Sequence, residues 1–383
     1  MDNLPPQNLI PGPIVLFGSG ETSPSGRKVF DTVMRKLPDL PRVALLETPA
    51  GFELNSAQVI GRVGDFIAHR LQNYNPRLTV VPARQRGTTF SPDNAEIIEP
   101  LYHSDMIFMG PGSPSYAVRQ LGESLAWHAT LARHRLGAAI ALASAAVVAV
   151  SAYALPVYEI YKVGEDLHWK KGLDLFGIYG VPLVFIPHWN NNDGGDELDT
   201  SRCFMGQPRF ARLMDMLPPD LTVVGIDEKT ALVIYPQDGS CHVVGLGGVT
   251  LIHTGTEHQD SSTREDLEGT GLSEVAQMRR GHVHHFQNGQ KFSLGRIGDF
   301  RPVEGGVGLP ENVWQHAIEA FNQPQDETPT PSEQVLMWVQ EREAARQRKD
   351  WGESDRLRNL IAGQGWQVLD TRDGPQLEFI EKK

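Results

Sequence analysis

Short apolar runs alternate with longer amphipathic segments along the chain from Ile14 to about Ile234. This alternation is typical of a mainly parallel sheet with helices on both of its faces. The predicted strands are Ile14–Phe17, Val43–Glu47, Leu78–Val81, Met106–Met109, Ala138–Ala143, Pro182–Ile186 and Leu221–Ile226. The helices predicted between them are Arg27–Lys36, Ser56–Gln72, Tyr116–Leu121, Ala145–Tyr153 and Arg209–Met216. We therefore expect an α/β fold.

The pattern changes after Ala231, where short β-rich pieces replace the alternation of strands and helices. These pieces are Ala231–Tyr235, Cys241–Gly245, Val249–His253 and Lys291–Leu294. Because such pieces are typical of antiparallel strands, we expect them to finish one edge of the sheet. The polar stretch Thr254–Gly281 interrupts them and is predicted to be a surface loop or an insertion.

A stretch rich in proline and polar residues, Gln323–Ser332, follows a predicted helix at Glu311–Asn322. Such a composition is typical of a linker. The sequence therefore predicts an α/β domain at residues 1–322, a linker at 323–332 and a helical module at 333–383. The module should contain a helix with Val335, Leu336, Val339 and Ala344 on its apolar face, a helix at Glu353–Ala362, a strand at Trp366–Leu369 and a turn at Arg372–Gly374.

The composition is that of an ordinary globular protein, since 40% of the 383 residues are hydrophobic and 21% are charged. No apolar run is long enough to cross a bilayer, and the Pro-rich segment Met1–Pro13 does not look like a secretion signal. Two cysteines, Cys203 and Cys241, are too few for a disulfide framework and suit the reducing cytoplasm. The net charge of −12 argues against whole-surface attraction to nucleic acid or anionic lipid. We expect a cytoplasmic protein with no membrane partner, and the sequence leaves a homo-oligomer open.

Three predicted strand ends carry a serine, a histidine and a glutamate. Ser144 follows the strand Ala138–Ala143 and precedes small apolar residues, which allow a sharp strand-to-helix turn to lift a hydroxyl clear of the sheet. His188 and Glu228 follow two later strands, at the edge where open α/β sheets hold their ligands. One edge is thus supplied with a nucleophile, an imidazole and a carboxylate. Taken alone, Ser144 is also typical of a serine that caps a buried helix.

Three further segments carry polar residues without a complete motif. Gly18–Ser23 lacks the lysine and the spacing of a nucleotide-binding loop, and we interpret it as a turn that lines the cleft. His282 and His284 share one face of a predicted strand, but no third ligand accompanies them, so we predict packing or solvated histidines and no metal site. Asn190–Asp196, close after His188, is either part of the pocket wall or a solvated turn. No cofactor is predicted.

The segments around these strand ends resemble the serine peptidase family of cyanophycinase and aspartyl dipeptidase, which has a type-1 glutamine amidotransferase-like fold. Gly110–Gly112 is similar to the family's Gly-Gly loop, and Ala143–Val147 is similar to its Thr-Ser-Ala-Gly-Ala elbow. Gly225–Ala231 closely matches its Gly-Ile-Asp-Glu-x-Thr-Ala strand. The order Ser, His, Glu is also that of the family and differs from the order in α/β-hydrolases. The resemblance covers Ile14–Leu294.

This resemblance implies a serine hydrolase that cleaves a peptide or isopeptide bond in a small substrate, of the aspartyl or cyanophycin type. Ser144 would be the nucleophile, His188 the general base and Glu228 the residue that orients the imidazole. The backbone amides of Gly112 and Ala145 would form the oxyanion hole.

Three positions depart from the family's pattern. Leu142 and Ala146 stand where glycine is usual, and Pro111 takes a loop position that is also usually glycine. Each adds a side chain or removes an amide close to the reaction centre. The alternative is therefore a catalytically silent binding or scaffold protein. An amidotransferase-type cysteine enzyme is a weaker third interpretation, because the elbow holds serine and Cys203 follows no obvious strand.

The C-terminal segments Arg342–Trp351, Ser354–Arg358 and Gly365–Thr371 resemble the tail domain of cysteinyl-tRNA synthetases. Such a tail helps to hold tRNA, which makes tRNA an expected partner of the module. The candidate phosphate contacts are Arg342, Arg346, Arg348 and Lys349. Because acidic residues alternate with these basic ones, a protein-interaction module without RNA affinity is the alternative.

Overall fold

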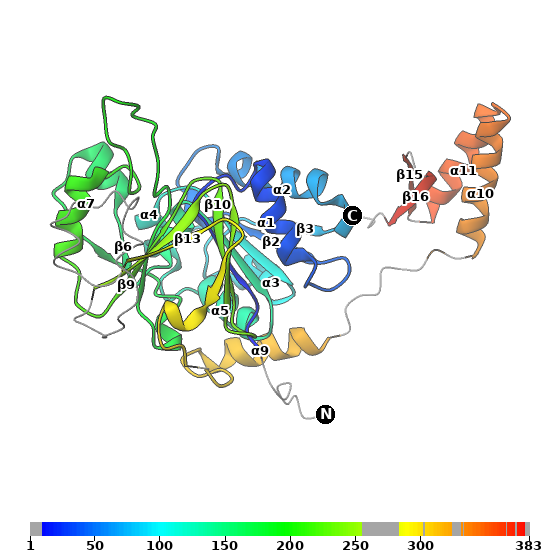
Figure 1. Ribbon diagram of the computed structural model, residues 1–383. Helices are drawn as coiled ribbons and strands as arrows, with labels where there is room; N and C mark the ends of the chain where they lie inside the picture. The colour runs from blue at the N-terminus through cyan, green and yellow to red at the C-terminus, as the bar shows by residue number, and fades with distance from the viewer. Residues whose placement is uncertain are drawn as a thin grey trace. The chain divides into compact units, whose positions relative to one another are not determined.

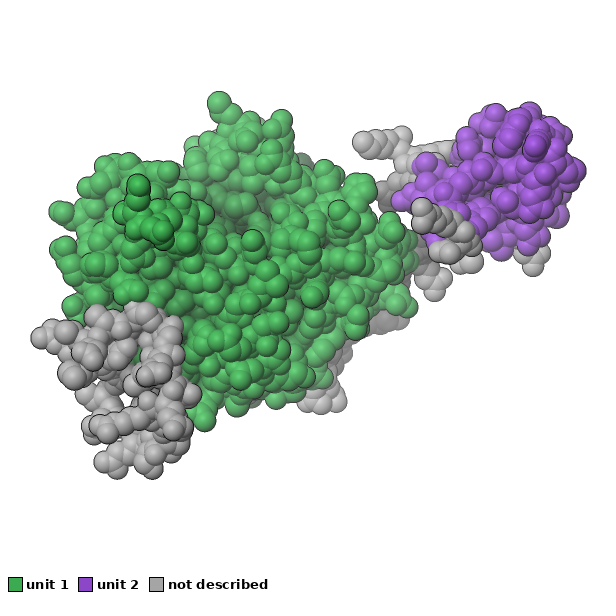
Figure 2. Space-filling view, turned by 45° about the horizontal axis from the view of Figure 1, so that its top comes forward, with its two compact units in different colours: residues 1–321 green, residues 322–383 purple. Residues whose placement is uncertain are grey.

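The computed structural model describes residues 10–254, 283–301, 303–323, 331, 333–364, 366–371 and 374–379. The chain forms two compact units, Met1–Phe321 and Asn322–Lys383, which have different colours in Figure 2. Within the described ranges, no helix combines the length and the apolar character that a bilayer crossing needs. Most of the predicted loop after Thr254 and most of the predicted linker lie outside the described residues, as do His282 and Arg372.

The first unit is built on an eight-stranded sheet. Its strands are β1 Ile14–Phe17, β2 Arg42–Leu46, β3 Arg77–Val81, β4 Met106–Met109, β5 Ala139–Ala143, β10 Thr230–Tyr235, β11 Ser240–Gly245 and β14 Lys291–Ser293. They lie in the order β14-β11-β10-β1-β5-β4-β2-β3. The strands from β1 to β3 in this order pair in parallel, whereas β10, β11 and β14 continue the sheet antiparallel. This arrangement confirms the predicted α/β fold class.

Helices cover both faces of this sheet (Figure 1). Because successive side chains of a strand point to opposite faces, β1 directs Ile14 and Leu16 into one apolar core and Val15 and Phe17 into another. The first core is closed by α3 Ala95–Tyr102, α5 Leu125–Arg135 and α9 Glu311–Asn322, and the second by α1 Pro24–Met34 and α2 Ser56–Arg70. Burying each large apolar side chain stabilises the unit by about 1.5–3 kcal/mol. This two-sided burial is why β1, β4 and β5 are continuous apolar runs in the sequence.

The sequence predicted one sheet in this unit, but the structure also has a second sheet, of four strands. Its strands, in the spatial order β13-β12-β9-β8, are β8 Leu183–Ile186, β9 Thr222–Ile226, β12 Gly248–His253 and β13 Val283–Gln287. The sequence pattern predicted β12 at the edge of one sheet, but β12 pairs antiparallel with β9. The cause is a pair of hydrogen bonds, because the backbone and the carboxylate of Asp227 both bond Gly248, at 3.1 and 2.8 Å. These bonds fasten the start of β12 to the end of β9.

The helix after Ser144 is shorter than predicted. The sequence suggested a helix through Tyr153, but α6 spans Ala145–Ala149. The hydroxyl of Ser151 accepts the amide hydrogen of Phe185 at 2.9 Å, and the amide of Ala152 donates to Leu183 at 2.7 Å. Bonding to β8 therefore takes over from helix bonding. The helix α7, Gly206–Asp215, packs with α6 on the second sheet.

Several short elements complete the first unit. They are η1 Thr48–Ala50, η2 Gln72–Tyr74, α4 Pro114–Leu121, β6 Tyr153–Ala154, the π-helix η3 Glu159–Val163, β7 Lys170–Lys171, η4 Gly177–Tyr179 and η6 Leu294–Arg296. Of these, η1 and α4 matter most for the site. α4 follows the glycine-containing loop after β4, and η1 contacts that loop, because the amide of Ser113 donates to the carbonyl of Pro49.

The second unit combines two helices with a hairpin. Its elements are α10 Glu333–Gln347, α11 Trp351–Gly363, β15 Trp366–Thr371 and β16 Gly374–Phe379. Its buried core contains Val335, Val339, Leu357, Ile361, Trp366 and Val368. Leu336, predicted on the apolar face, is instead 45% exposed. The next position on the buried face after Val339 is Arg342, whose fully buried side chain binds both carboxylate oxygens of Asp370 at 2.8 and 2.9 Å.

Candidate active site

Ser144 occupies a sharp turn between β5 and α6. Its backbone has a φ of 52° and a ψ of −112°, a conformation that residues with a side chain rarely adopt. Holding such a conformation costs on the order of 1–3 kcal/mol, so the surrounding structure must enforce it. β5 supplies that support, because it is paired on both sides, with β1 and β4. The turn lifts the hydroxyl of Ser144 from the end of the strand.

His188 also has a positive φ, of 51°. It lies just beyond the end of β8, and its amide donates to the carbonyl of Gly18 at 3.0 Å. The next amide, that of Trp189, donates to Ile226 at 3.1 Å, at the end of β9. The loop that carries the imidazole is therefore tied to the ends of β1 and β9.

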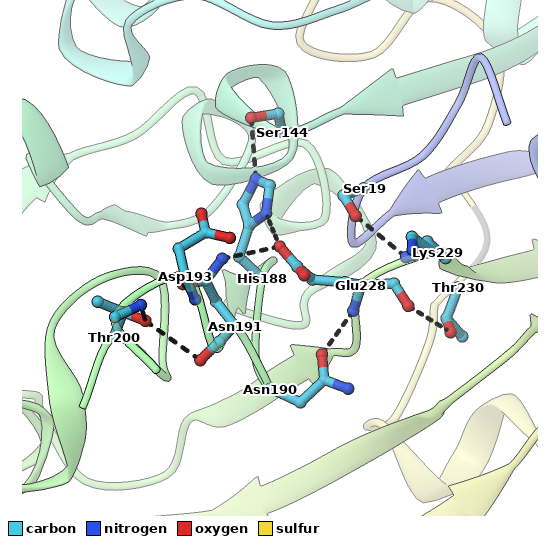
Figure 3. A network of polar contacts seen from close by, with 11 residues as sticks. Ser19, Ser144, His188, Asn190, Asn191, Asp193, Thr200, Glu228, Lys229 and Thr230 are labelled. Atoms are coloured by element: carbon cyan, nitrogen blue, oxygen red, sulfur yellow. Dashed lines mark hydrogen bonds and ion pairs between the residues drawn. The ribbon is translucent and has the colours of Figure 1, made fainter. Parts of the chain in front are cut away.

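Ser144, His188 and Glu228 form a continuous chain of hydrogen bonds (Figure 3). The Oγ of Ser144 lies 3.2 Å from Nε2 of His188, and Nδ1 of His188 lies 3.0 Å from Oε1 of Glu228. An ionised carboxylate only accepts, so Nδ1 carries the proton and Nε2 is left to accept from the serine hydroxyl. The side chains of His188 and Glu228 are 17% and 29% exposed. This is the geometry of a nucleophile, a base and a group that orients the base.

The surroundings favour an ionised Glu228. The hydrogen bond from His188 lowers the pKa of the Glu228 carboxyl, with smaller contributions from Asn191 and Lys229, while burial acts in the opposite direction. The neighbouring Asp227 faces elsewhere, since its Oδ2 accepts from Gly248, and burial raises its pKa. Glu228 is thus the carboxylate that faces the imidazole.

The loop after β4 begins at the end of the strand that neighbours β5. Gly112 has a φ of 147°, and a Cβ at this position would come within 1.9 Å of the carbonyl oxygen of Pro49. Only glycine fits there. Within the described part of the chain, the amides of Gly112 and Ala145 have no hydrogen-bond acceptor. Two such amides at the ends of neighbouring strands are suited to receive a negatively charged oxygen.

The three departures from the family's pattern leave the turn in place. Leu142 and Ala146 are buried in the apolar core between the sheet and its helices, with exposures of 0% and 1%. Both side chains therefore contribute to the packing of this core. Pro111 has no amide hydrogen to offer, but the loop remains anchored because the amide of Ser113 donates to Pro49 at 3.0 Å.

The sequence interpretation of the polar loop after His188 was incomplete. Asn190 and Asn191 both contact Glu228, the first through its Oδ1 to the backbone amide at 2.8 Å and the second through its Nδ2 to Oε1 at 2.9 Å (Figure 3). Asn191 is only 3% exposed, which argues against a simple solvated turn. The run of asparagines in Asn190–Asp196 was the available signal.

The turn predicted to line the cleft lies against the same site. The hydroxyl of Ser19 accepts the amide hydrogen of Lys229 at 3.0 Å, and the carbonyl of Gly18 holds the amide of His188. Burial raises the pKa of Glu21, which belongs to this turn, and a backbone hydrogen bond and the electrostatic influence of His188 oppose that rise.

Cys203 is close to the site but unsuited to nucleophilic chemistry. Its side chain is buried, and burial together with the nearby Glu228 raises the pKa of its thiol to about 12. The thiol is therefore protonated at neutral pH, whereas the thiolate is the reactive form. Serine, and not this cysteine, stands at the end of β5.

No group of three metal-ligating side chains occurs among the residues that the structure describes. His282 lies outside them. His284, on β13, instead packs its ring against that of His253, with the ring centres 5.9 Å apart.

The four basic residues considered for phosphate contact divide into two pairs. Arg342 and Arg346 both bond Asp370 at 2.8 Å, and Arg342 is fully buried. Arg342 therefore serves the interior of the module and cannot reach a phosphate without breaking its core. Arg348 and Lys349, at the end of α10, are exposed.

No protein-family model matches the chain. The fold is similar to the crystal structure of a peptidase from an acI-B1 Actinobacterium, with a TM-score of 0.54 and 19% identity, over 75% of this chain and 98% of that chain. A putative peptidase E protein from Listeria monocytogenes EGD-e gives a TM-score of 0.41 and 16% identity, over 62% of this chain and 99% of that chain. The first likeness shows a peptidase-like fold.

The curated relatives match a short segment only. The cysteine–tRNA ligase of Methanosarcina acetivorans is 46% identical over 50 residues, which are 13% of this chain and 11% of the ligase. That of Methylocella silvestris is 50% identical over 42 residues, 11% of this chain and 9% of the ligase. The chain thus spans about a tenth of the length of these relatives.

Proposed function

We propose that the first unit is a serine hydrolase that cleaves a peptide or isopeptide bond. The observation that carries this proposal is the relay from Ser144 through His188 to Glu228, with bonds of 3.2 and 3.0 Å. A serine capping a helix needs neither a strained backbone nor an imidazole at its hydroxyl. The peptidase-like fold supports the same assignment.

The chemistry follows from the order of the bonds. The Oγ of Ser144 attacks the scissile carbonyl carbon while Nε2 of His188 takes the hydroxyl proton, and Glu228 stabilises the imidazolium that forms. The amides of Gly112 and Ala145 receive the carbonyl oxygen as it becomes negative. His188 then gives the proton to the leaving amine. Water, deprotonated by the same imidazole, releases the acyl group from Ser144.

The substrate class follows from the resemblance of the site segments to cyanophycinase and aspartyl dipeptidase. We propose a small peptide or isopeptide of aspartyl or cyanophycin type. The support is the likeness of Gly225–Ala231 to the family's strand, together with a fold similar to that of the actinobacterial peptidase. The catalytically silent scaffold is the competing proposal.

A fluorophosphonate probe separates these two proposals. The probe reacts with a serine hydroxyl that a neighbouring base activates, so we expect the wild-type protein to be phosphonylated and peptide mapping to place the adduct on Ser144. The Ser144→Ala protein should remain unmodified under the same conditions. A folded wild-type protein without any adduct, at reagent levels that label other serine hydrolases, would establish the silent scaffold.

We further propose that the second unit is an interaction module whose partner is tRNA. Its support is the resemblance of segments within Arg342–Thr371 to the tail domain of cysteinyl-tRNA synthetases, the 50-residue match of this chain to a cysteine–tRNA ligase, and the exposed pair Arg348 and Lys349. Full-length protein should bind tRNA with an affinity that falls steeply as salt rises, measured by filter binding. Lys349→Glu should weaken binding and flatten the salt slope, whereas Lys28→Glu, an exposed reversal on α1, should do neither. Binding that is absent at low salt would favour a protein partner.

A further inference from the structure

Asn191 is a buried residue that contacts the carboxylate of Glu228. It follows His188 by three positions, and its amide nitrogen Nδ2 lies 2.9 Å from Oε1 of Glu228. The same oxygen accepts the proton of His188 Nδ1 at 3.0 Å. One carboxylate oxygen therefore has two donors, an imidazole and a carboxamide (Figure 3). The remaining 3% exposure of Asn191 leaves little access for water to replace its amide.

The orientation of this carboxamide is fixed by its own contacts. Its Oδ1 accepts the backbone amide of Asp193 at 3.2 Å, which leaves Nδ2 to face the carboxylate. The backbone amide of Asn191 donates to the carbonyl of His188 at 3.2 Å, and its carbonyl accepts from the hydroxyl of Thr200 at 3.4 Å. The donor is thus held rigidly in the loop that carries the imidazole.

We propose that Asn191 is a positioning residue of the hydrolase, which acts by fixing Glu228 in the rotamer that orients His188. The inference rests on the function proposed above. Asn190 holds the backbone of Glu228 and Asn191 holds its carboxylate, so the carboxylate cannot turn away from the imidazole. A donor to the ionised form also favours that form. The imidazole consequently keeps the tautomer in which Nε2 accepts from Ser144.

Other charged and titratable groups act on this pair from neighbouring elements. Lys229 favours the ionised Glu228, whereas Asp227 and the Cys203 thiol are the acidic groups that interact with it electrostatically. Glu21 acts on the imidazole of His188 from the turn after β1. These groups remain in place when Asn191 alone is changed. A change in the pH profile after substitution therefore reports on the carboxamide.

The test uses the rate of Ser144 modification by a fluorophosphonate in the full-length protein, measured across pH. Asn191→Leu removes the donor and should slow modification about 10- to 100-fold, the cost of one hydrogen bond to a charged group. Asn192→Leu, at an exposed position of the same loop, is the matched control and should stay within about twofold of the wild type.

Asn191→Asp gives a second and sharper readout. An aspartate keeps the acceptor for the amide of Asp193 but sets a carboxyl group against Glu228. Two such groups share a proton, with one apparent pKa raised. Below that pKa the protonated carboxyl donates as the carboxamide did, and above it two carboxylates repel. The rate should therefore fall as pH rises through this pKa, in a range where the wild-type rate does not fall.

The outcomes separate the two proposals. A wild-type protein that is never modified at Ser144 removes the hydrolase and the role of Asn191 with it. Modification of the wild type, together with wild-type rates and an unchanged pH profile in Asn191→Asp, retains the hydrolase and overturns the role of Asn191. Should Asn191→Leu fail to fold, as judged by thermal unfolding, the profile of Asn191→Asp decides.

Discussion

Replacing Ser144 by alanine is expected to lower kcat for an aspartyl-type peptide about 10⁵-fold or more while the fold is retained. The expected loss is this large because the hydroxyl is the group that forms the covalent intermediate. The fold should survive because alanine keeps the Cβ, so the strain at a φ of 52° is unchanged. The residues that flank Ser144, Ala143 and Ala145, are already alanines.

The partners of Ser144 should follow a defined order of severity. His188→Ala is expected to be nearly as damaging, because no other base lies at the hydroxyl among the described contacts. Glu228→Gln should leave more residual rate, since the amide keeps the packing but weakens the support of the imidazolium. The double variant of Ser144 and His188 should cost little beyond either change alone, because the residues act as a unit.

These rates are best measured as steady-state hydrolysis, with circular dichroism and thermal unfolding as checks on the fold. Ser240→Ala, on β11, is the matched serine control and should keep the wild-type rate. A Ser144→Ala protein with substantial residual hydrolysis would contradict serine chemistry. Independent, additive losses in the double variant would contradict the relay.

The strands that carry the site could be predicted almost to the residue. β1, β4 and the strands before Ser144, His188 and Glu228 are buried on both faces, so their side chains are almost all apolar. Such runs stand out in a sequence. The division into two sheets did not stand out, because it depends on hydrogen bonds between Asp227 and Gly248, which lie far apart in the sequence.

Two helices of the first unit escaped prediction, for reasons that their residues show. α5 is buried on nearly every side, and its last residues, Arg133, His134 and Arg135, are buried as well. A helix without an exposed polar face lacks the period that identifies an amphipathic helix. α3 has Pro100 in its interior, which argues against a helix when the sequence is judged locally.

The residues of the candidate site also differ in how far they could be predicted from the sequence. Ser144, His188 and Glu228 could be proposed from strand ends and from a family's motifs. Asn191 could not, because its role depends on a donor and an acceptor brought within 2.9 Å by a loop of irregular structure. Arg342 shows the converse error, since a basic residue on a helix was assigned to a surface and lies in the core instead.

His134, like Asn191 and Arg342, is a residue whose role depends on its surroundings. Its imidazole is completely buried at the end of α5, and Nε2 lies 2.7 Å from the hydroxyl of Tyr179. Burial lowers the pKa of this imidazole to about 4, with a further push from Arg135 and an opposing contribution from the backbone of Ala138. The neutral form is thus required in the folded first unit.

Acidification should therefore destabilise the first unit through His134. The unfolded chain binds a proton at this imidazole below about pH 6.5, whereas the folded protein binds one only below about pH 4. The stabilisation is fully present above pH 6.5 and is lost as pH falls toward 4, because the unfolded state takes up the proton first. The loss should reach about 3 kcal/mol in the free energy of unfolding.

Urea unfolding of the wild type and of His134→Gln, at intervals from pH 8 to pH 4.5, measures this contribution. Glutamine carries no titrating group, and its terminal amide reaches about as far as Nε2 toward Tyr179. The difference between the two proteins at pH 8 gives the cost of the altered packing. On acidification the wild type should lose about 2 kcal/mol more than the variant by pH 5. A difference that stays constant across the range would mean that His134 is not kept neutral by burial, and that the acid sensitivity of the fold arises elsewhere.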